Sequence, residues 1–376
     1  MTSGDVRQPF IPPPYPYDRL GRLRDVAGRH DGGAVDMSIG TPCDPPPRVV
    51  LDALALSRSE RSYPPSIGTI EYREAAAGWM RRRLGVEIGP GDIAACVGTK
   101  EFVAGLPHLL RLRRPDLDTV LFPAVAYPSY EMGATLAGCR AVPVPLDDEW
   151  RLDLSAVHPD DAARALCLWV NTPGNPAGGL DDLAAVATWG RNHDIPVFSD
   201  ECYIEFTWNG ARRTILESGT SGVVAVHSLS KRSNLAGARA GCYAGDSELV
   251  GYLSEVRKHL GLMVPGPVQA AAVAAWSDDA HVDSQAAIYR SRLERMAAVL
   301  GSMGIEVGLP DGAFYLWVPA PGGDAWGLAS RLAEVAGVVG SPGEFYGPAA
   351  ATHVRLAVVQ PDDRVELVEQ RVGTRR

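Results

Sequence analysis

Short apolar runs alternate with helical patterns along most of the chain. The runs that we predict to be strands cover residues 93–97, 119–122, 141–144, 165–170, 196–199, 222–227 and 241–244. Each run is short and almost wholly apolar, as expected for a strand that is buried on both faces. Such strands, separated by helical patterns, predict an α/β fold in which the strands are laid parallel between crossover helices.

The pattern changes on either side of this region. Residues 1–48 are rich in proline and glycine and show little helical or strand periodicity, which indicates an N-terminal arm. Near the other end, helical patterns at 267–276 and 282–303 precede an apolar and aromatic stretch at 307–318, which predicts a strand in a second lobe. The expected division is an arm that forms part of a small domain (1–48), a large domain (49–265) and a C-terminal small α+β domain (266–376).

Composition and charge exclude several classes of partner. Of the 376 residues, 46% are hydrophobic, which is enough for a packed core, and 36 basic residues face 45 acidic ones. This acidic balance gives no electrostatic attraction to nucleic acid or to an anionic membrane. No run has the roughly 20 apolar residues of a membrane helix, and the first residues lack the apolar core of a signal peptide. We therefore expect a cytoplasmic protein without nucleic-acid or membrane partners.

Chemistry that requires an amine has few candidates in this chain. The lysines are Lys100, Lys231 and Lys258, and the six cysteines lack the spacing of a metal site, so no metal is expected. Lys231 closely follows the apolar run 222–227, where partial burial would lower its pKa and make the nucleophilic amine available. Ser228, Ser230 and Arg239 flank it and suit a phosphate dianion. Taken alone, Lys231 is more simply a solvated residue at a strand end.

Other predicted strands also end in polar groups. Asp200 ends one apolar run, Asn175 lies in the proline-rich loop after another, and Gly98, Thr99 and Lys100 follow a third. Each has an ordinary explanation as a helix cap or a turn. In an open α/β sheet, however, ligands bind at this edge, and a glycine before a helix exposes N–H groups to an anion. Together these groups supply an amine, a carboxylate, an amide and a phosphate cradle, which match pyridoxal 5'-phosphate (PLP).

Ordered motifs recur over residues 36–359 and carry a family resemblance. The motifs are SIGTPCDP, VGTKE, FPAVAYPSYEMGA, SDECY, HSLSKRSNLAG, RKHLGLMVPGPVQAA and GEFYGP. Through them the chain resembles the class I and II aminotransferases of fold type I, most of all the actinobacterial N-succinyldiaminopimelate aminotransferases. The resemblance implies a mostly parallel seven-stranded sheet in the large domain, a smaller α+β domain, PLP as cofactor and a homodimer with shared active sites.

The resemblance also implies roles for individual residues. Lys231 would bond covalently to the cofactor and act as general base, and Asp200 would pair with the pyridine nitrogen. Asn175 and Tyr203 would bond the ring oxygen, and Tyr127 would stack on the ring. The implied phosphate ligands are the Gly98, Thr99 and Lys100 segment, Ser228, Ser230 and Arg239, with Tyr63 reaching over from a second subunit. The implied ligands of the substrate α-carboxylate are Gly40, Asn175 and Arg355.

The implied reaction is transamination between glutamate with 2-oxoglutarate and N-succinyl-LL-2,6-diaminopimelate with its 6-oxo acid, in lysine and diaminopimelate biosynthesis. Candidate contacts for the distal acidic group of the substrate are Arg257, Lys258 and His259, or residues of the arm such as Tyr15 and Tyr17. The alternative is that these residues are surface charges and packing aromatics. The chain departs from the commoner family pattern at Ala177, Tyr72 and residues 233–235, and none of these changes removes a group that PLP chemistry needs.

Two alternatives share the same motifs. One is a PLP enzyme for aromatic, aspartate or specialised-metabolite substrates, or a carbon–sulfur β-lyase, because the fate of the substrate depends on how it is held. The other is a PLP-binding regulatory protein without turnover.

Overall fold

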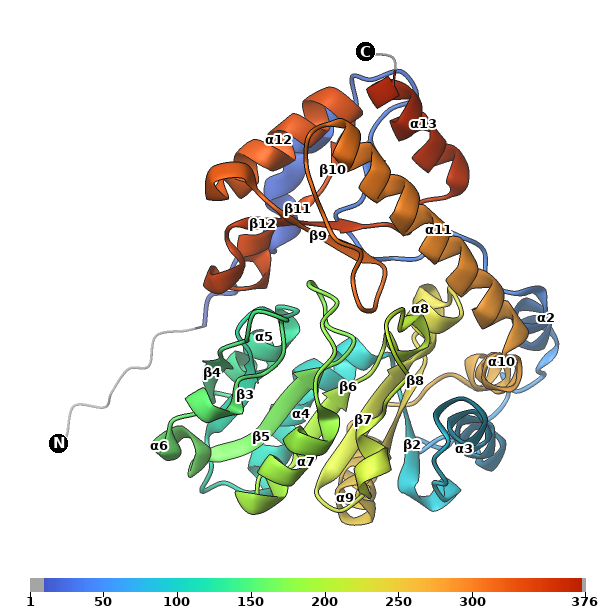
Figure 1. Ribbon diagram of the computed structural model, residues 1–376. Helices are drawn as coiled ribbons and strands as arrows, with labels where there is room; N and C mark the ends of the chain where they lie inside the picture. Colours follow the sequence, from blue (N-terminus) through green and yellow to red (C-terminus); the bar gives the residue numbers. More distant parts are fainter. Residues whose placement is uncertain (1–9, 374–376) are drawn as a thin grey trace.

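The computed structural model describes residues 10–373 and forms two lobes, one above the other in Figure 1. The strands of the lower lobe are β2 (Ile93–Cys96), β3 (Thr119–Pro123), β4 (Arg140–Val144), β5 (Ala165–Asn171), β6 (Val197–Asp200), β7 (Val223–Ser228) and β8 (Gly241–Gly245). They form one sheet in the order β2-β8-β7-β6-β5-β3-β4. Only β8 runs antiparallel to its neighbours in this sheet. The predicted mostly parallel seven-stranded sheet is therefore confirmed.

The apolar runs form strands because helices cover both faces of the sheet. One face packs against α2 (Arg48–Leu56), α3 (Ile70–Leu84), α7 (Leu183–Asn192) and α10 (Gly266–Ser277). The other packs against α4 (Thr99–Arg113), α5 (Ser129–Leu136) and α9 (Ser247–His259). Leu121 faces the first layer, whereas Val120 and Phe122 face the second. Since most positions on both faces are buried, successive strand residues are mostly apolar, which is the pattern that the sequence shows.

Within residues 10–373, the upper lobe holds a second, smaller sheet and four α-helices. A three-stranded antiparallel sheet combines β11 (Ser341–Pro342), β12 (His353–Ala357) and β9 (Tyr315–Pro319). The helices are α1 (Gly21–Ala27), α11 (Ala280–Ser302), α12 (Ala325–Ala336) and α13 (Asp362–Gly373). The predicted helices at 267–276 and 282–303 correspond to α10 and α11, and α11 descends from the upper lobe towards α10 in Figure 1.

Two expectations from the sequence need correction. The strand expected at 307–318 begins only at Tyr315, because the Pro310-Asp311-Gly312 turn docks on the lower lobe, where Trp208 N donates to Asp311 O at 2.7 Å. Residues 1–48 were expected to have little regular structure, but α1 lies there, and β1 (Val35–Asp36) pairs with β10 (Val338–Val339) in the core of the upper lobe. Such short elements contain too few residues for a hydrophobic period to be recognised in the sequence. The domain boundaries stay a prediction, and residues 1–9 and 374–376 lie outside the described residues.

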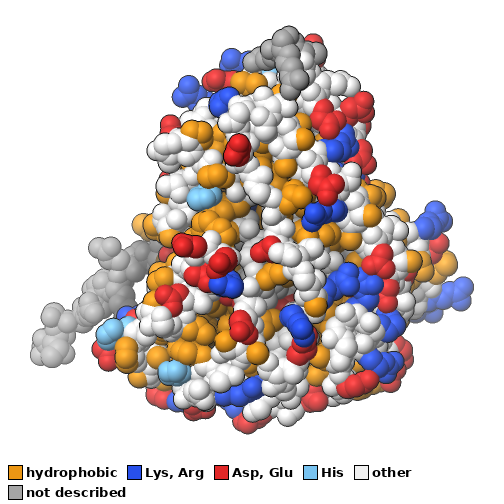
Figure 2. All heavy atoms as spheres, in the orientation of Figure 1, with side chains coloured by type: hydrophobic (Ala, Val, Ile, Leu, Met, Phe, Trp, Pro, Cys, Tyr) orange, Lys and Arg blue, Asp and Glu red, His pale blue; other side chains and the backbone are white. Residues whose placement is uncertain are grey.

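Charged side chains are mixed on the face that Figure 2 displays, where acidic and basic groups alternate instead of gathering by sign. Within residues 10–373, no helix combines the length and the apolar composition that a membrane crossing requires.

A buried network of charged side chains connects elements of the lower lobe next to Lys231. The Glu205 carboxylate accepts hydrogen bonds from Trp79 Nε1 at 2.7 Å, Arg83 Nη2 at 2.9 Å and Arg232 Nε at 3.2 Å. Only 2% of the Glu205 side chain is exposed. Because these donors come from α3 and from α8 (Leu229–Arg232), the network fixes the helical turn that carries Lys231.

Replacing Glu205 with alanine should leave the buried Arg232 guanidinium and the partly buried Arg83 guanidinium short of a partner. We expect Glu205→Ala to lower the free energy of unfolding by about 3–5 kcal/mol, measured by urea denaturation followed by circular dichroism. The matched control is Asp283→Ala, which removes a mostly exposed partner of the same Arg83 and should cost no more than about 1 kcal/mol. Equal losses in the two variants would contradict this account of the network.

Candidate active site

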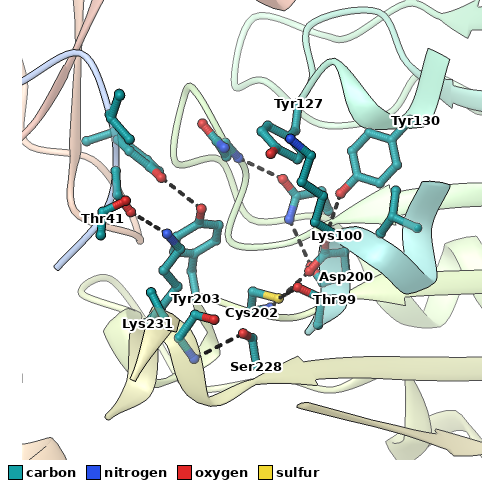
Figure 3. A pocket seen from close by; sticks show the side chains of 18 of the residues that line it. Thr41, Thr99, Lys100, Tyr127, Tyr130, Asp200, Cys202, Tyr203, Ser228 and Lys231 are labelled. Atoms are coloured by element: carbon teal, nitrogen blue, oxygen red, sulfur yellow. Dashed lines mark hydrogen bonds between the residues drawn. The ribbon is translucent and has the colours of Figure 1, made fainter. Parts of the chain in front are cut away.

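A cavity of about 450 Å³ lies between the two lobes, at the carboxyl ends of β5, β6 and β7. It brings together most of the residues that the sequence singled out. These lining residues are Gly40, Thr99, Lys100, Tyr127, Asn175, Asp200, Tyr203, Ser228, Ser230, Lys231, Arg239 and Arg355. Figure 3 shows Lys231, Tyr203, Asp200 and Tyr127 directed into this pocket from different elements. The carboxyl ends of the strands therefore form the lower wall of the pocket. Proteins with an open α/β sheet bind their ligands at this edge.

Lys231 lies in α8, directly after β7. Its Nζ donates a hydrogen bond to the Gly40 carbonyl, which belongs to the segment before α2. The amine lies among protein atoms, and this burial lowers the pKa of Lys231 to about 8, with the positive charges of Arg355 and Arg239 acting in the same direction. The neutral, nucleophilic form of the amine is thus far more populated near neutral pH than for an ordinary lysine.

Asp200 ends β6 and is buried at the floor of the pocket. The Tyr130 hydroxyl donates to Asp200 Oδ2 at 2.8 Å, and Cys202 N donates to Oδ1 at 3.2 Å. Burial raises the pKa of Asp200, while the hydrogen bonds from Cys202 and Tyr130 and the charge of Lys231 oppose that rise. This carboxylate is held rigidly and is suited to receive a cationic N–H group.

A chain of amide hydrogen bonds joins the strand ends to the upper lobe. Asn171 Nδ2 donates to Asp200 O at 2.9 Å, and Asn175 N donates to Asn171 Oδ1 at 2.8 Å. Arg355 Nη1 then donates to Asn175 Oδ1 at 2.9 Å. The loop after β5 is therefore fixed at both ends, which positions the Asn175 amide in the pocket.

Arg355 projects into the pocket from β12 and is 2% exposed. Its guanidinium carbon lies 4.4 Å from the ring centroid of Tyr315 and 4.8 Å from that of Tyr346. Besides its bond to Asn175, it donates to Ser38 O at 2.6 Å. Its Nε is buried without a hydrogen-bond partner among the described residues. A planar cation held in this way is suited to a carboxylate, which accepts two hydrogen bonds from one guanidinium.

The N-terminus of α4 and the residues around Lys231 form a cradle for a dianion. Gly98 precedes α4 with a φ of 76°, and no side chain of the described residues caps this helix. A Cβ at Gly98 would lie 2.2 Å from Arg239 Nη2, so only glycine allows that guanidinium so close. The helix N–H groups, Arg239 and the hydroxyls of Thr99, Ser228 and Ser230 fit a phosphate group. Gly98 is not itself a lining residue.

The candidates for the distal substrate group divide into two sets. Tyr15 and Tyr17 line the pocket, but Arg257, Lys258 and His259 do not. The expectation for Arg257 is wrong for a physical reason: it is buried in the α4–α9 layer, where Nη1 and Nη2 bond the Glu101 carboxylate at 2.7 and 2.6 Å. Lys258 instead pairs with Glu255 on the surface.

Tyr63 is also absent from the pocket lining and is 93% exposed. Its predicted contact with the phosphate requires a second subunit, so it stays a prediction.

Several pocket residues were missed from the sequence. They are Asn171, Tyr130 and Tyr315, and the sequence also missed Tyr346 and Ser38, which contact Arg355 without lining the pocket. Asn171 ends an apolar run as Asp200 does, so the same signal would have found it. The aromatic residues carry no such signal, because an aromatic side chain within an apolar stretch predicts only a core position.

Residues 33–370 match the family described as aminotransferase class I and II. The chain belongs to this family. The aminotransferase is 40% identical to the 4-dedimethylamino-4-oxo-anhydrotetracycline transaminase OxyQ of Streptomyces rimosus, over 96% of this chain and 99% of that protein. It is 31% identical to the LL-diaminopimelate aminotransferase of Aquifex aeolicus, over 96% of each chain. It also resembles the solved structure of a probable N-succinyldiaminopimelate aminotransferase from Thermus thermophilus, with 30% identity, a TM-score of 0.83, and coverage of 95% of this chain and 99% of that chain.

Membership of the family decides the class of chemistry. Class I and II aminotransferases depend on PLP, so this protein is a PLP-dependent transaminase. Its relatives are enzymes, which disfavours the alternative of a regulatory protein without turnover.

The lowered pKa of Lys231 leads to a test of the amine. Since only the neutral amine attacks an aldehyde, covalent capture of PLP by the cofactor-free protein should accelerate from about pH 7 to about pH 9, with a midpoint near the pKa of about 8. Borohydride reduction followed by peptide mass spectrometry should place the adduct on Lys231. Lys231→Ala should abolish the adduct, and the control Lys258→Ala, which removes a surface lysine, should leave it unchanged. An adduct on Lys100 would refute the assignment.

Proposed function

We propose that this aminotransferase exchanges an amino group between glutamate with 2-oxoglutarate and N-succinyl-LL-2,6-diaminopimelate with its 6-oxo acid. The observation that carries the proposal is the pair of cations, Arg355 and Lys100, which enter one pocket from opposite lobes beside Lys231. Both proposed substrates carry an α-carboxylate and a second, distant acidic group. The similarities to an LL-diaminopimelate aminotransferase and to a probable N-succinyldiaminopimelate aminotransferase support a substrate of this type.

The residues of the pocket divide the work of the reaction. When bound, PLP supplies an electron-accepting ring that stabilises the negative charge left at the substrate Cα. Asp200 would hold a proton on the ring nitrogen, while Tyr203 and Asn175 would donate to the ring oxygen and Tyr127 would cover the ring. Arg355 binds the substrate α-carboxylate and so orients the Cα–H bond. Lys231 Nζ removes the proton from this Cα.

We assign the distal carboxylate to Lys100. Its Nζ lies 5.2 Å from the ring centroid of Tyr15 and 5.8 Å from that of Tyr127, and no described carboxylate forms an ion pair with it. Desolvation opposes its charge, but the two phenols act against this and raise the pKa of Lys100 on balance. It therefore stays cationic and can attract an anionic group, which replaces the role that the sequence suggested for Arg257.

A second candidate is amination of an oxo group on a polycyclic substrate. The similarity to OxyQ, which is named for a 4-oxo-anhydrotetracycline, extends over nearly the whole of both chains. In that case glutamate would still bind through Arg355 and Lys100, and only the acceptor would differ. The acceptor therefore decides between the two candidates.

A substrate panel on the purified enzyme tests the proposal. We expect transfer from glutamate to the 6-oxo acid of N-succinyl-2,6-diaminopimelate, with no release of pyruvate from cysteine-type substrates. Amination of a cyclic ketone in preference to that oxo acid would favour the second candidate, and pyruvate release would favour a lyase.

The role of Lys100 is tested by Lys100→Met, which keeps most of the length of the side chain and removes its charge. The KM for glutamate should rise about 10–100-fold, because a charged hydrogen bond is lost, whereas the KM for alanine should change by no more than about 3-fold. Lys258→Met, on the surface, is the control and should change neither value. Equal increases for the two amino acids would remove Lys100 from the distal site.

We further propose a homodimer in which Tyr63 completes the phosphate site of the other subunit. Mixing inactive Lys231→Ala subunits with Tyr63→Ala subunits should then restore activity, because in a mixed dimer one site has both native residues. With equal amounts and free exchange, about a quarter of the sites would be native. Activity that never exceeds the mean of the two separate variants would show that Tyr63 acts within its own subunit or not at all.

A further inference from the structure

Tyr315, at the start of β9, contacts two parts of the pocket that serve different partners. Its hydroxyl lies 2.8 Å from the Tyr203 hydroxyl, and its ring lies 4.4 Å from the guanidinium carbon of Arg355. It is 1% exposed, and a Cβ at Gly40 would lie 2.3 Å from its hydroxyl oxygen. Tyr315 is thus confined between the proposed partner of the cofactor ring and the proposed partner of the substrate.

Each phenol has one hydroxyl hydrogen, and this decides which of Tyr203 and Tyr315 donates in the hydrogen bond between them. If Tyr203 donates its single hydroxyl hydrogen to the ring oxygen of the cofactor, it has none left for Tyr315. Tyr315 must then donate to the Tyr203 oxygen. A phenol that accepts a hydrogen bond becomes a stronger donor in turn, because bonds in a chain polarise one another.

Arg355 depends on the same residue in a different way. The guanidinium carbon of Arg355 lies 4.4 Å from the ring centroid of Tyr315 and 4.8 Å from that of Tyr346. The two rings therefore restrict the orientation of the guanidinium plane. The Tyr346 hydroxyl bonds Tyr17 at 3.0 Å, away from Tyr203. Tyr346 therefore shares the contact with Arg355 and lacks the contact with Tyr203.

We infer that Tyr315 is a positioning residue that couples the cofactor site to the substrate site: its hydroxyl strengthens the Tyr203 donor, and its ring orients Arg355. This inference rests on the proposed roles of Tyr203 and Arg355. It assigns two separable effects to one side chain, one to the hydroxyl and one to the ring.

The hydroxyl effect is read from the visible absorbance of the bound cofactor as pH is varied. A donor to the ring oxygen stabilises its anionic form, so weakening Tyr203 should raise the midpoint of this titration. We expect Tyr315→Phe to raise it by about half a pH unit, Tyr203→Phe to raise it further, and Tyr346→Phe to leave it unchanged. The other titratable or charged groups that face the two phenols are Tyr17, Tyr127, Cys202 and Arg355, and all stay in place in Tyr315→Phe.

The ring effect is read from the binding of maleate, an unreactive dicarboxylate, to the holoenzyme. Tyr315→Phe keeps the ring and should change the dissociation constant by no more than about 2-fold. Tyr315→Leu should weaken maleate binding about 5–30-fold, because Arg355 loses one of the two aromatic rings that lie beside its guanidinium. Circular dichroism and the cofactor content of each variant confirm that it folds and is loaded.

The outcomes separate the inference from the proposal beneath it. A midpoint that moves in Tyr203→Phe but not in Tyr315→Phe overturns the coupling and leaves the role of Tyr203 intact. A midpoint that is unmoved in Tyr203→Phe refutes the proposed role of Tyr203 itself. Equal maleate affinities for Tyr315→Leu and Tyr315→Phe overturn the ring effect.

Discussion

Ionisable side chains that are largely shielded from water meet in one pocket, and the surrounding structure supplies the hydrogen-bond partners that offset the cost of burying them. Asp200 and Arg355 are buried, and Lys231 is largely enclosed. Such groups are destabilising unless each finds hydrogen-bond partners. Asp200 accepts hydrogen bonds from Tyr130 and Cys202. Arg355 donates to Asn175 and Ser38, and the rings of Tyr315 and Tyr346 lie beside its guanidinium. Groups at the strand ends and in the upper lobe thus provide the hydrogen bonds that water would otherwise make to these charges.

The two lobes are needed together because neither holds a complete set of partners. Lys231 belongs to the lower lobe, but its hydrogen-bond acceptor is Gly40, on the segment that leads from the upper lobe. Arg355 belongs to the upper lobe, but its side-chain acceptor is Asn175, on a loop of the lower lobe. The early segment of the chain, which looked like an arm from its composition, is therefore part of the wall of the site. Its role follows from contacts distant in sequence, which composition does not encode.

How much the sequence predicts depends on whether a residue's role follows from its neighbours in the chain. Lys231, Asp200 and Thr99 lie where a strand gives way to a loop or helix, and an apolar run followed by a polar residue is a local signal. Six of the seven strands were predictable for the same reason, since burial on both faces leaves an uninterrupted apolar run, whereas β4 lies at the sheet edge and is only partly buried. Tyr130 and Tyr315 act through single hydrogen bonds to residues 70 and 112 positions away, and nothing local distinguishes them from core aromatics.

Arg257 illustrates a residue whose chemistry suggested a role that its surroundings exclude. From the sequence it was a candidate for an anionic substrate, yet the Glu101 carboxylate neutralises it inside a helix layer. Lys100, one residue before that glutamate, reaches the pocket because α4 begins at the pocket edge and turns successive side chains by about 100°. Adjacent residues of α4 thus face the core and the pocket. Charge alone does not place a side chain in the pocket; its direction from the helix does, and that direction depends on where the helix begins.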